Sequence, residues 1–378
     1  DESRSQNPES HNTGDTQSET ASATADVKGS EANGSPADIF CEAIPPEAAT
    51  LPPGTNPDGP WLAPGGRLVA ALGVNRVVPG FPSDVAVHPV GHVAYITTSG
   101  YRERRLLVVN LMTYEVLQSV TRDDAFYGLE VAPDGAWVYA SAGASGRVER
   151  FPVDAGGLLG APEAIQIGGF TAGLALSSEG GTLWVGSLTV EALVEIDTDT
   201  WTEARRISVP AKTWDVVHVA AQSELYLSDL TAGGIVVVAL VQWSIAEVLE
   251  VPTSPAGMAV SPDGDRVWAA VSGTDAIATI DTTQGFISSW TTIGDESWTD
   301  GEGSPLAHSN INSLWHDPET DRLYASRGAD NAVSVYDADS LNYEGMIPTS
   351  WYPTDVEIVP GRNLLIISEG KGGGAGPN

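Results

Sequence analysis

The sequence predicts an all-β fold, a seven-bladed β-propeller of four-stranded blades. Three observations carry this prediction. A unit of roughly 42 to 45 residues recurs from Phe81 towards the C-terminus, each unit contains four short strand-like segments, and no helical periodicity separates them. The 41 glycines and 25 prolines are typical of many short strands joined by tight turns.

The recurring unit is clearest in two copies, SPAGMAVSPDGDRVWAAVSGTDAIATIDTTQG from Ser254 and NINSLWHDPETDRLYASRGADNAVSVYDADS from Asn310. The equivalent starts of all copies are Phe81, Ala125, Phe170, Lys212, Ser254, Asn310 and Tyr352. One step is longer than the others because residues Gly294–Ser309 form an insertion. Seven units are therefore predicted, which is a common size for a propeller ring.

Within each unit, an inner strand such as DVAVHP or GMAVSP ends in a turn, and a second strand carries a large side chain at one register. That register is occupied by Tyr95, Tyr139, Trp184, Tyr226, Trp268, Tyr324 and Ile366. A third strand and a looser outer strand follow. Because their apolar residues alternate or run continuously, we expect blades that are packed on both faces.

The seventh copy contains only two strands before the chain runs into GKGGGAGPN. We expect Gly65–Gly80 (GGRLVAALGVNRVVPG) to supply the missing strands, since a closed ring leaves no exposed sheet edge. The predicted organisation is a disordered acidic Ser/Thr-rich tail, a Pro-rich lead-in, the propeller and a Gly-rich linker. Their boundaries are residues 1–40, 41–64, 65–370 and 371–378.

The net charge of −32 argues against any nucleic-acid partner, since phosphate backbones would be repelled. Cys41 is the only cysteine, which excludes an internal disulfide. No long apolar run is present, so no transmembrane span is predicted. The polar N-terminal tail is compatible with a lipid anchor upstream of residue 1 or with a secreted linker, and we expect an extracellular, cell-surface or periplasmic protein.

Three tetrapeptides at the second-strand register carry a family resemblance: Tyr95-Ile96-Thr97-Thr98, Tyr139-Ala140-Ser141-Ala142 and Tyr226-Leu227-Ser228-Asp229. They resemble the hallmark of the YVTN family of bacterial and archaeal surface-associated β-propellers. The segments GGRLVAALG, SGYRERRLLVVN and GMIPTSWYPTDVEIVPGRNLLIISEGKGGGAGPN look most like the propeller that some bacterial proteins fuse to a phosphoesterase domain of the alkaline-phosphatase type. That hydrolase domain is not in this sequence, so the resemblance transfers no catalytic residue.

The residue that opens each inner strand should ring one mouth of the central channel. These rim positions are Asp84, Gly128, Gly173, Asp215, Gly257, Ser313 and Asp355. The first and last copies become neighbours when the ring closes, which brings two rim carboxylates together. Asp84, Asp215 and Asp355 are therefore candidate ligands of a metal such as Ca²⁺. The alternative is that each carboxylate caps backbone amides at its strand entrance.

Aromatic residues precede several rim positions, and the insertion brings further acids and aromatics towards the same face. The predicted ligand-binding set comprises Asp84, Tyr127, Trp214, Asp215, Trp298, Asp355, Trp351 and Tyr352. A surface of aromatic and carboxylate groups suits a sugar chain, a cationic group or a partner protein. The alternative is that the aromatic side chains pack between blades.

No catalytic set stands out, because the six histidines are scattered and the sequence has no HExxH, GxSxG or Walker motif. The preferred function is a binding or interaction scaffold with a protein or carbohydrate partner. The alternative is a hydrolase, either lactonase-like with a metal at the channel mouth or the propeller part of a phosphoesterase. No cofactor is assigned, and Ca²⁺ is the one candidate.

Overall fold

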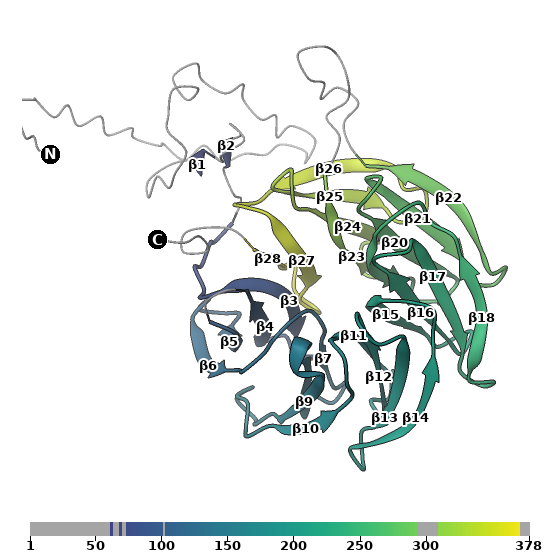
Figure 1. Ribbon diagram of the computed structural model, residues 1–378. Helices are drawn as coiled ribbons and strands as arrows, with labels where there is room; N and C mark the ends of the chain where they lie inside the picture. Colours follow the sequence, from purple (N-terminus) through teal and green to yellow (C-terminus); the bar gives the residue numbers. More distant parts are fainter. Residues whose placement is uncertain (1–60, 63–67, 70–72, 101–102, 294–308, 371–378) are drawn as a thin grey trace, which may run out of the picture. The chain divides into compact units, whose positions relative to one another are not determined.

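The computed structural model describes residues 61–62, 68–69, 73–100, 103–293 and 309–370, which all belong to one compact unit, residues 46–378 (Figure 1). The predicted tail at 1–40, most of the lead-in, the linker at 371–378 and the insertion up to residue 308 lie outside the described residues. The described part is all-β apart from one turn of 3₁₀-helix, η3 (Gly143–Ser145), which confirms the predicted class. It contains no helix long and apolar enough to span a membrane.

Six four-stranded antiparallel sheets form the blades of a β-propeller. Blade 1 contains β3 (Phe81–Val87), β4 (Val93–Ser99), β5 (Arg105–Asn110) and β6 (Val116–Thr121). Blade 2 contains β7 (Leu129–Val131), β8 (Trp137–Ser141), β9 (Arg147–Pro152) and β10 (Glu163–Gln166). Blade 3 contains β11 (Thr171–Leu176), β12 (Thr182–Ser187), β13 (Ala192–Asp197) and β14 (Thr202–Ser208).

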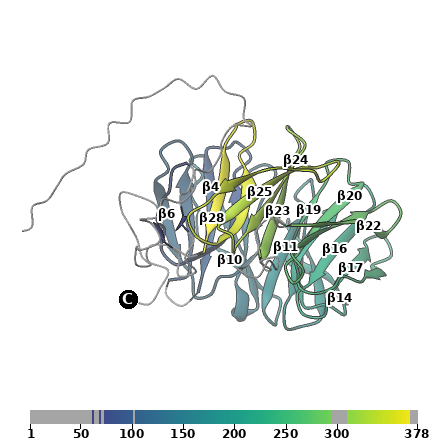
Figure 2. The ribbon, with the colours of Figure 1, turned by 90° about the horizontal axis from the view of Figure 1, so that it is seen from above.

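The remaining blades repeat this order from the inner to the outer strand, and Figure 2 shows the strands of the ring side by side. Blade 4 contains β15 (Thr213–Val219), β16 (Glu224–Asp229), β17 (Gly234–Ala239) and β18 (Ser244–Leu249). Blade 5 contains β19 (Pro255–Val260), β20 (Arg266–Val271), β21 (Ala276–Asp281) and β22 (Phe286–Thr292). Blade 6 contains β23 (Ile311–Asp317), β24 (Arg322–Arg327), β25 (Ala332–Asp337) and β26 (Tyr343–Pro348).

A two-stranded sheet, here called the closing sheet, consists of β27 (Pro353–Ile358) and β28 (Leu365–Glu369). Its inner strand β27 lies between β23 of blade 6 and β3 of blade 1, so it completes the ring (Figure 1). The expectation of seven four-stranded blades is thereby corrected: the structure has six blades and a closing sheet of two strands.

Among the described residues, the predicted completion of the last blade by residues 65–80 is not found either. In this region β2 (Leu68–Val69) pairs with β1 (Trp61–Leu62), not with β28. Residues 73–80 contain no strand. Gly73 and Gly80 have φ angles of 88° and 84°, and Pro79 has no amide hydrogen, so this stretch cannot run as a continuous ladder partner.

Short turns hold the third and fourth strands of several blades together. The side-chain oxygens of Asn110, Asp197, Asp281 and Asp337 accept backbone amides two or three residues further on. These Asx turns replace backbone turn bonds and permit the tight connections that the composition predicted.

The hydrophobic core lies between blades. Most aromatic side chains predicted on the second strands, including Tyr95, Tyr226 and Trp268, are almost fully buried there, whereas Tyr324 is half-buried. Each burial of this size stabilises the fold by about 1.5–3 kcal/mol. Clusters of buried residues join each pair of consecutive blades, for example β16 and β17 to β19, β20 and β21. The ring is therefore held by its blade seams.

Candidate functional site

Three rim carboxylates reach across to the next inner strand. Asp84 Oδ2 accepts the Gly128 amide at 2.8 Å, Asp215 Oδ2 accepts the Met258 amide at 2.9 Å, and Asp355 Oδ2 accepts the Val85 amide at 3.0 Å. All three carboxyl groups are buried. The sequence analysis offered the alternative that each carboxylate caps backbone amides at its own strand entrance. In these three bonds the carboxylate does cap an amide, but the amide belongs to the neighbouring sheet.

Glycine occupies a rim position where the next strand approaches too closely for a side chain. A Cβ atom on Gly173 would lie 2.5 Å from the Asp215 Cα atom. A Cβ atom on Gly257 would lie 2.9 Å from the Ser313 Cα atom. The alternation of Asp, Ser and Gly among rim positions therefore follows what the next inner strand presents.

Asp84 and Asp355 are brought together at the seam between blade 1 and the closing sheet, as predicted from ring closure. Burial raises the pKa of Asp84 well above its usual value, and the neighbouring Asp355 carboxylate raises it further. Burial also raises the pKa of Asp355, but hydrogen bonds from Ser313, at 2.5 Å, and Asp84 counteract that rise. The two carboxyl groups therefore titrate as one coupled pair, in which burial and mutual repulsion favour the protonated form.

Two further acids, Glu130 on β7 and Glu357 on β27, join the rim carboxylates. Burial, and then the Asp215 charge, raises the pKa of Glu130 to about 8, and burial raises the pKa of Asp215 to about 7. Burial, and then Asp355, raises the pKa of Glu357 well above its usual value. Because blades 2 and 4 are not neighbours, the interaction of Glu130 with Asp215 runs across the channel.

We call Asp84, Glu130, Asp215, Asp355 and Glu357 the channel acids. The sequence analysis missed Glu130 and Glu357. Each stands two residues after a rim position, in the segments GLEV and DVEI, and this spacing is the signal that could have identified them. Glu357 Oε2 is buried without a hydrogen-bond partner among the described residues.

An aromatic cluster adjoins the channel acids. Tyr127 stacks on Trp214 with ring centroids 5.2 Å apart and planes 20° apart. Phe126 packs edge-on against Phe170 and Trp214 at 4.7 and 5.4 Å. Burial and the charge of Asp215 raise the pKa of Tyr127 well above its usual value, so its hydroxyl stays protonated. The structure thus places Tyr127 and Trp214 beside the channel acids, and the role of these residues in ligand binding stays a prediction.

The predicted aromatic Tyr352 lies in another seam. The Tyr352 hydroxyl accepts a hydrogen bond from Asn310 Nδ2 at 2.5 Å, and its ring packs on Gly328 of blade 6, so Tyr352 lies between sheets. Trp351 is half-buried beside it. Trp298, with the insertion that carries it, lies outside the described residues.

The rim carboxylates were also candidates for a metal site. Within the ranges that the structure describes, no three His, Cys, Asp or Glu side chains are placed to hold a metal ion. Asp215 uses Oδ1 to accept the Val216 amide at 2.8 Å and Oδ2 to accept the Met258 amide. The predicted Ca²⁺ ligand set of Asp84, Asp215 and Asp355 thus gains no support from the described residues and stays a prediction.

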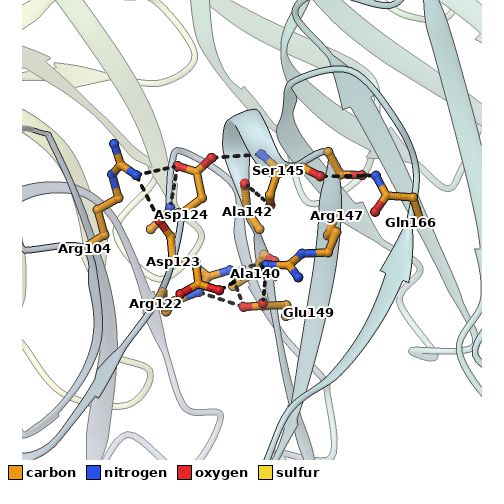
Figure 3. Close-up of polar contacts among 12 residues, drawn as sticks. Arg104, Arg122, Asp123, Asp124, Ala140, Ala142, Ser145, Arg147, Glu149 and Gln166 are labelled. Atoms are coloured by element: carbon orange, nitrogen blue, oxygen red, sulfur yellow. Dashed lines mark hydrogen bonds and ion pairs between the residues drawn. The ribbon is translucent and has the colours of Figure 1, made fainter.

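A second charged cluster lies at the seam of blades 1 and 2 (Figure 3). Arg122 is buried, and its Nε atom donates to Glu149 at 2.9 Å. Arg104 lies 3.5 Å from Asp124, whose other oxygen accepts the Ser145 amide at 2.9 Å. Since acids balance these arginines, the cluster joins the blades and offers no net positive charge to an anion.

Comparison with known proteins supports the fold. No protein-family model and no curated protein matches the chain. A solved structure named hydrazine synthase, from Kuenenia stuttgartiensis, matches with a TM-score of 0.66 and 17% sequence identity, over 79% of this chain and 94% of that chain. This chain has a β-propeller fold. At that identity the likeness extends to the fold alone, and the YVTN resemblance has no support beyond its own tetrapeptides.

Proposed function

We propose that this β-propeller is an interaction scaffold whose channel mouth binds a positively charged group of a protein partner. The observation that carries the proposal is the convergence of the channel acids beside the Tyr127–Trp214 stack. Carboxylates and aromatic faces both attract cations, and the attraction is stronger in a site shielded from water.

The state of the channel acids supports this choice of ligand. Without a cation, burial and mutual repulsion raise the pKa values of Asp84, Glu130 and Glu357, that of Glu130 to about 8. A bound ammonium or guanidinium group would favour their ionised forms, so binding should release protons. The net charge of −32 would in addition steer cationic partners towards the protein.

No observation favours the hydrolase alternative over binding. The rim carboxylates are engaged with backbone amides of neighbouring strands, and no metal-ligand group is present in the described part of the chain. The proposal also includes the insertion at 294–309, since it leads from β22 directly into the inner strand that carries Ser313. A location outside the cell is supported by the YVTN-like tetrapeptides and is testable by protease digestion of intact cells.

Isothermal titration of the full chain with a tetralysine peptide tests the binding proposal, with tetraglutamate as the control peptide. Glu130→Gln and Glu357→Gln remove channel acids while keeping side-chain size. We expect each to weaken tetralysine binding about tenfold, or 1.4 kcal/mol. Glu115→Gln changes an exposed acid on the outer side of blade 1 and should bind like the unmodified protein.

Proton release gives a second readout. The binding heat for tetralysine should differ between buffers of different ionisation enthalpy, and less so in the two channel variants. Equal affinity of all four proteins for tetralysine, or no binding at low salt, would reject the channel mouth as a cation site.

A further inference from the structure

A pocket of about 490 Å³ lies between blades 1 and 2, at the far end of β3 from the rim. Its lining residues are His88, Val90, His92, Asp134, Gly135, Ala136, Val153, Asp154 and Ala155. His88 follows rim residue Asp84 by four positions, about 13 Å along an extended strand. This pocket is therefore distinct from the channel mouth, and we call it the histidine pocket.

The sequence His88-Pro89-Val90-Gly91-His92 turns between β3 and β4 and places two imidazoles together, with ring centroids 4.5 Å apart. His88 Nδ1 accepts the Val90 amide at 3.2 Å. Burial, and then the neighbouring His92, lowers the pKa of His88, so His88 is neutral at pH 7.

The imidazole ring of His92 lacks the hydrogen bonds that a buried histidine normally makes. Both of its ring nitrogens are buried without a hydrogen-bond partner among the described residues. An unpaired buried polar atom costs about 1–3 kcal/mol, so a pair of them on one ring indicates that a partner is missing. One nitrogen of a neutral imidazole donates and the other accepts, and a hydroxyl group can serve either of them.

Two carboxylates complete the pocket. Asp134 Oδ1 accepts the Ala136 amide at 2.9 Å, and Asp154 Oδ1 accepts the Leu158 amide at 2.9 Å. These bonds hold each side chain in place, while each residue stays exposed to solvent. The lining contains no lysine or arginine, so its net charge is negative.

We propose that the histidine pocket binds a small hydroxylated amine of the amino-sugar class. The ammonium group would lie between Asp134 and Asp154, a ligand hydroxyl would satisfy His92, and Val90 and Val153 would cover the carbon skeleton. The volume falls in the range of about 300–1,000 Å³ that is typical of small-molecule sites, and a lone metal ion would leave most of it unfilled.

Access to His92 requires a small movement of the turn at Gly157. A Cβ atom on Gly157 would lie 3.0 Å from His92 Nε2, so the backbone of this turn covers the nitrogen. Tyr95 anchors the same turn through a 3.0 Å hydrogen bond from its hydroxyl to the Gly157 carbonyl. Ligand binding should therefore shift the amide signals of residues 154–158.

Titration of the full chain with glucosamine tests the proposal, and glucose and N-acetylglucosamine serve as matched probes without the positive charge. We expect glucosamine to bind at least about tenfold more tightly than either neutral sugar. Asp134→Asn and Asp154→Asn should remove that preference while keeping the turn bond to Oδ1. Asp263→Asn is the control, because Asp263 makes the same turn in blade 5, accepting the Asp265 amide at 3.1 Å, and does not line the pocket.

The proposal is overturned if all three sugars bind equally, if none binds, or if glucosamine binding survives both aspartate substitutions. Loss of glucosamine binding in Glu357→Gln, but not in Asp134→Asn, would assign the amine to the channel. Melting temperatures of the variants close to that of the unmodified protein ensure that lost binding is not lost folding.

Discussion

The rim positions meet the next inner strand in two ways. A carboxylate at Asp84, Asp215 or Asp355 accepts a backbone amide of that strand. At Gly173 and Gly257, the backbone of that strand comes too close for a side chain. The side chain at a rim position is therefore decided by the neighbouring sheet. Where an amide points towards the channel, a carboxylate satisfies it. Where the backbone of the next inner strand comes close to the rim position, only glycine leaves enough space, because it has no side chain.

The raised pKa values of the channel acids predict a pH-dependent stability. The pKa values of Asp215 and Glu130 are raised to about 7 and about 8, so the folded protein keeps protons that the unfolded chain releases near pH 4. These two acids should therefore make stability fall as pH rises from about 4, with the decline ending near pH 7 for Asp215 and near pH 8 for Glu130, and the part between pH 6.5 and 8.5 is the one to measure. His88 and His218, whose pKa values are lowered, act in the opposite direction only below about pH 6.5.

Urea unfolding of the unmodified protein and of Glu130→Gln across this window measures the effect. We expect the unmodified protein to lose up to about 1.4 kcal/mol per pH unit for each titrating acid, and Glu130→Gln to show a shallower decline. Glu115→Gln should follow the unmodified protein. A stability that rises between pH 6.5 and 8.5 would contradict the assignment of raised pKa values.

At the scale of elements, the inner strands share one irregularity. In β3, β11, β15, β19, β23 and β27 the register with the second strand shifts at or beside the rim position. A β-bulge bends its strand and redirects a side chain. The repeated bulge therefore explains how the rim carboxylates reach the next sheet, although Asp84 and Asp355 still pair with Thr97 and Ser368 in their own sheets.

Gly173→Ala tests the contact between inner strands β11 and β15. The new Cβ atom would lie 2.5 Å from the Asp215 Cα atom and 2.7 Å from the Trp214 carbonyl oxygen, both of which are backbone atoms that cannot rotate away. We expect a loss of about 1–3 kcal/mol in the free energy of unfolding, measured by urea titration.

Gly181→Ala in the same blade is the matched control for that substitution. A Cβ atom there meets nothing within 4 Å, so stability should change little. Equal stability of the two variants would show that the inner strands are not packed as closely as described.

At the scale of the whole molecule, the closing sheet joins the two ends of the ring. Thr354 Oγ1 donates to the Pro82 carbonyl at 2.9 Å, and Arg362 donates to the Gly91 and Leu111 carbonyls at 3.3 Å each. Val359 packs with buried residues of blade 1, among them Val85 and Val87. Although it has only two strands, the closing sheet therefore makes both hydrogen bonds and apolar contacts to the first blade.

Two truncations separate the contribution of this sheet from that of the N-terminal hairpin. Ending the chain at Thr349 removes β27 and β28, exposes the seam surface of β3, and should give aggregated protein without a cooperative melt. Starting the chain at Gly73 removes β1 and β2, which pair only with each other among the described strands, and should leave a cooperative melt. Size-exclusion chromatography and thermal melting distinguish these outcomes, and the reverse pattern would restore the N-terminal strands as the closing element.

Much of the fold could be predicted because propeller repeats are local. A strand with an aromatic at a fixed register, such as that of Tyr226 or Trp268, is visible in a few residues of sequence, and the structure places these side chains in the blade seams. The partner of the last two strands could not be predicted the same way, since strand pairing over a long sequence separation leaves no local pattern. Residues 65–80 looked strand-like, but β2 pairs with β1.

The sequence by itself determined the all-β class and the order of the strands, because both depend on periodicity and turn chemistry within one repeat. The rim residues that were expected to open the inner strands lie inside them, as Asp84 does in β3 and Asp215 in β15. Only the tertiary structure decided that there are six blades and a two-stranded closing sheet. It also decided that Glu130 and Glu357 join the rim carboxylates and that His88 contacts His92. Those arrangements depend on which strands meet around the ring, and burial in that ring, not residue type, sets the chemistry of the acids.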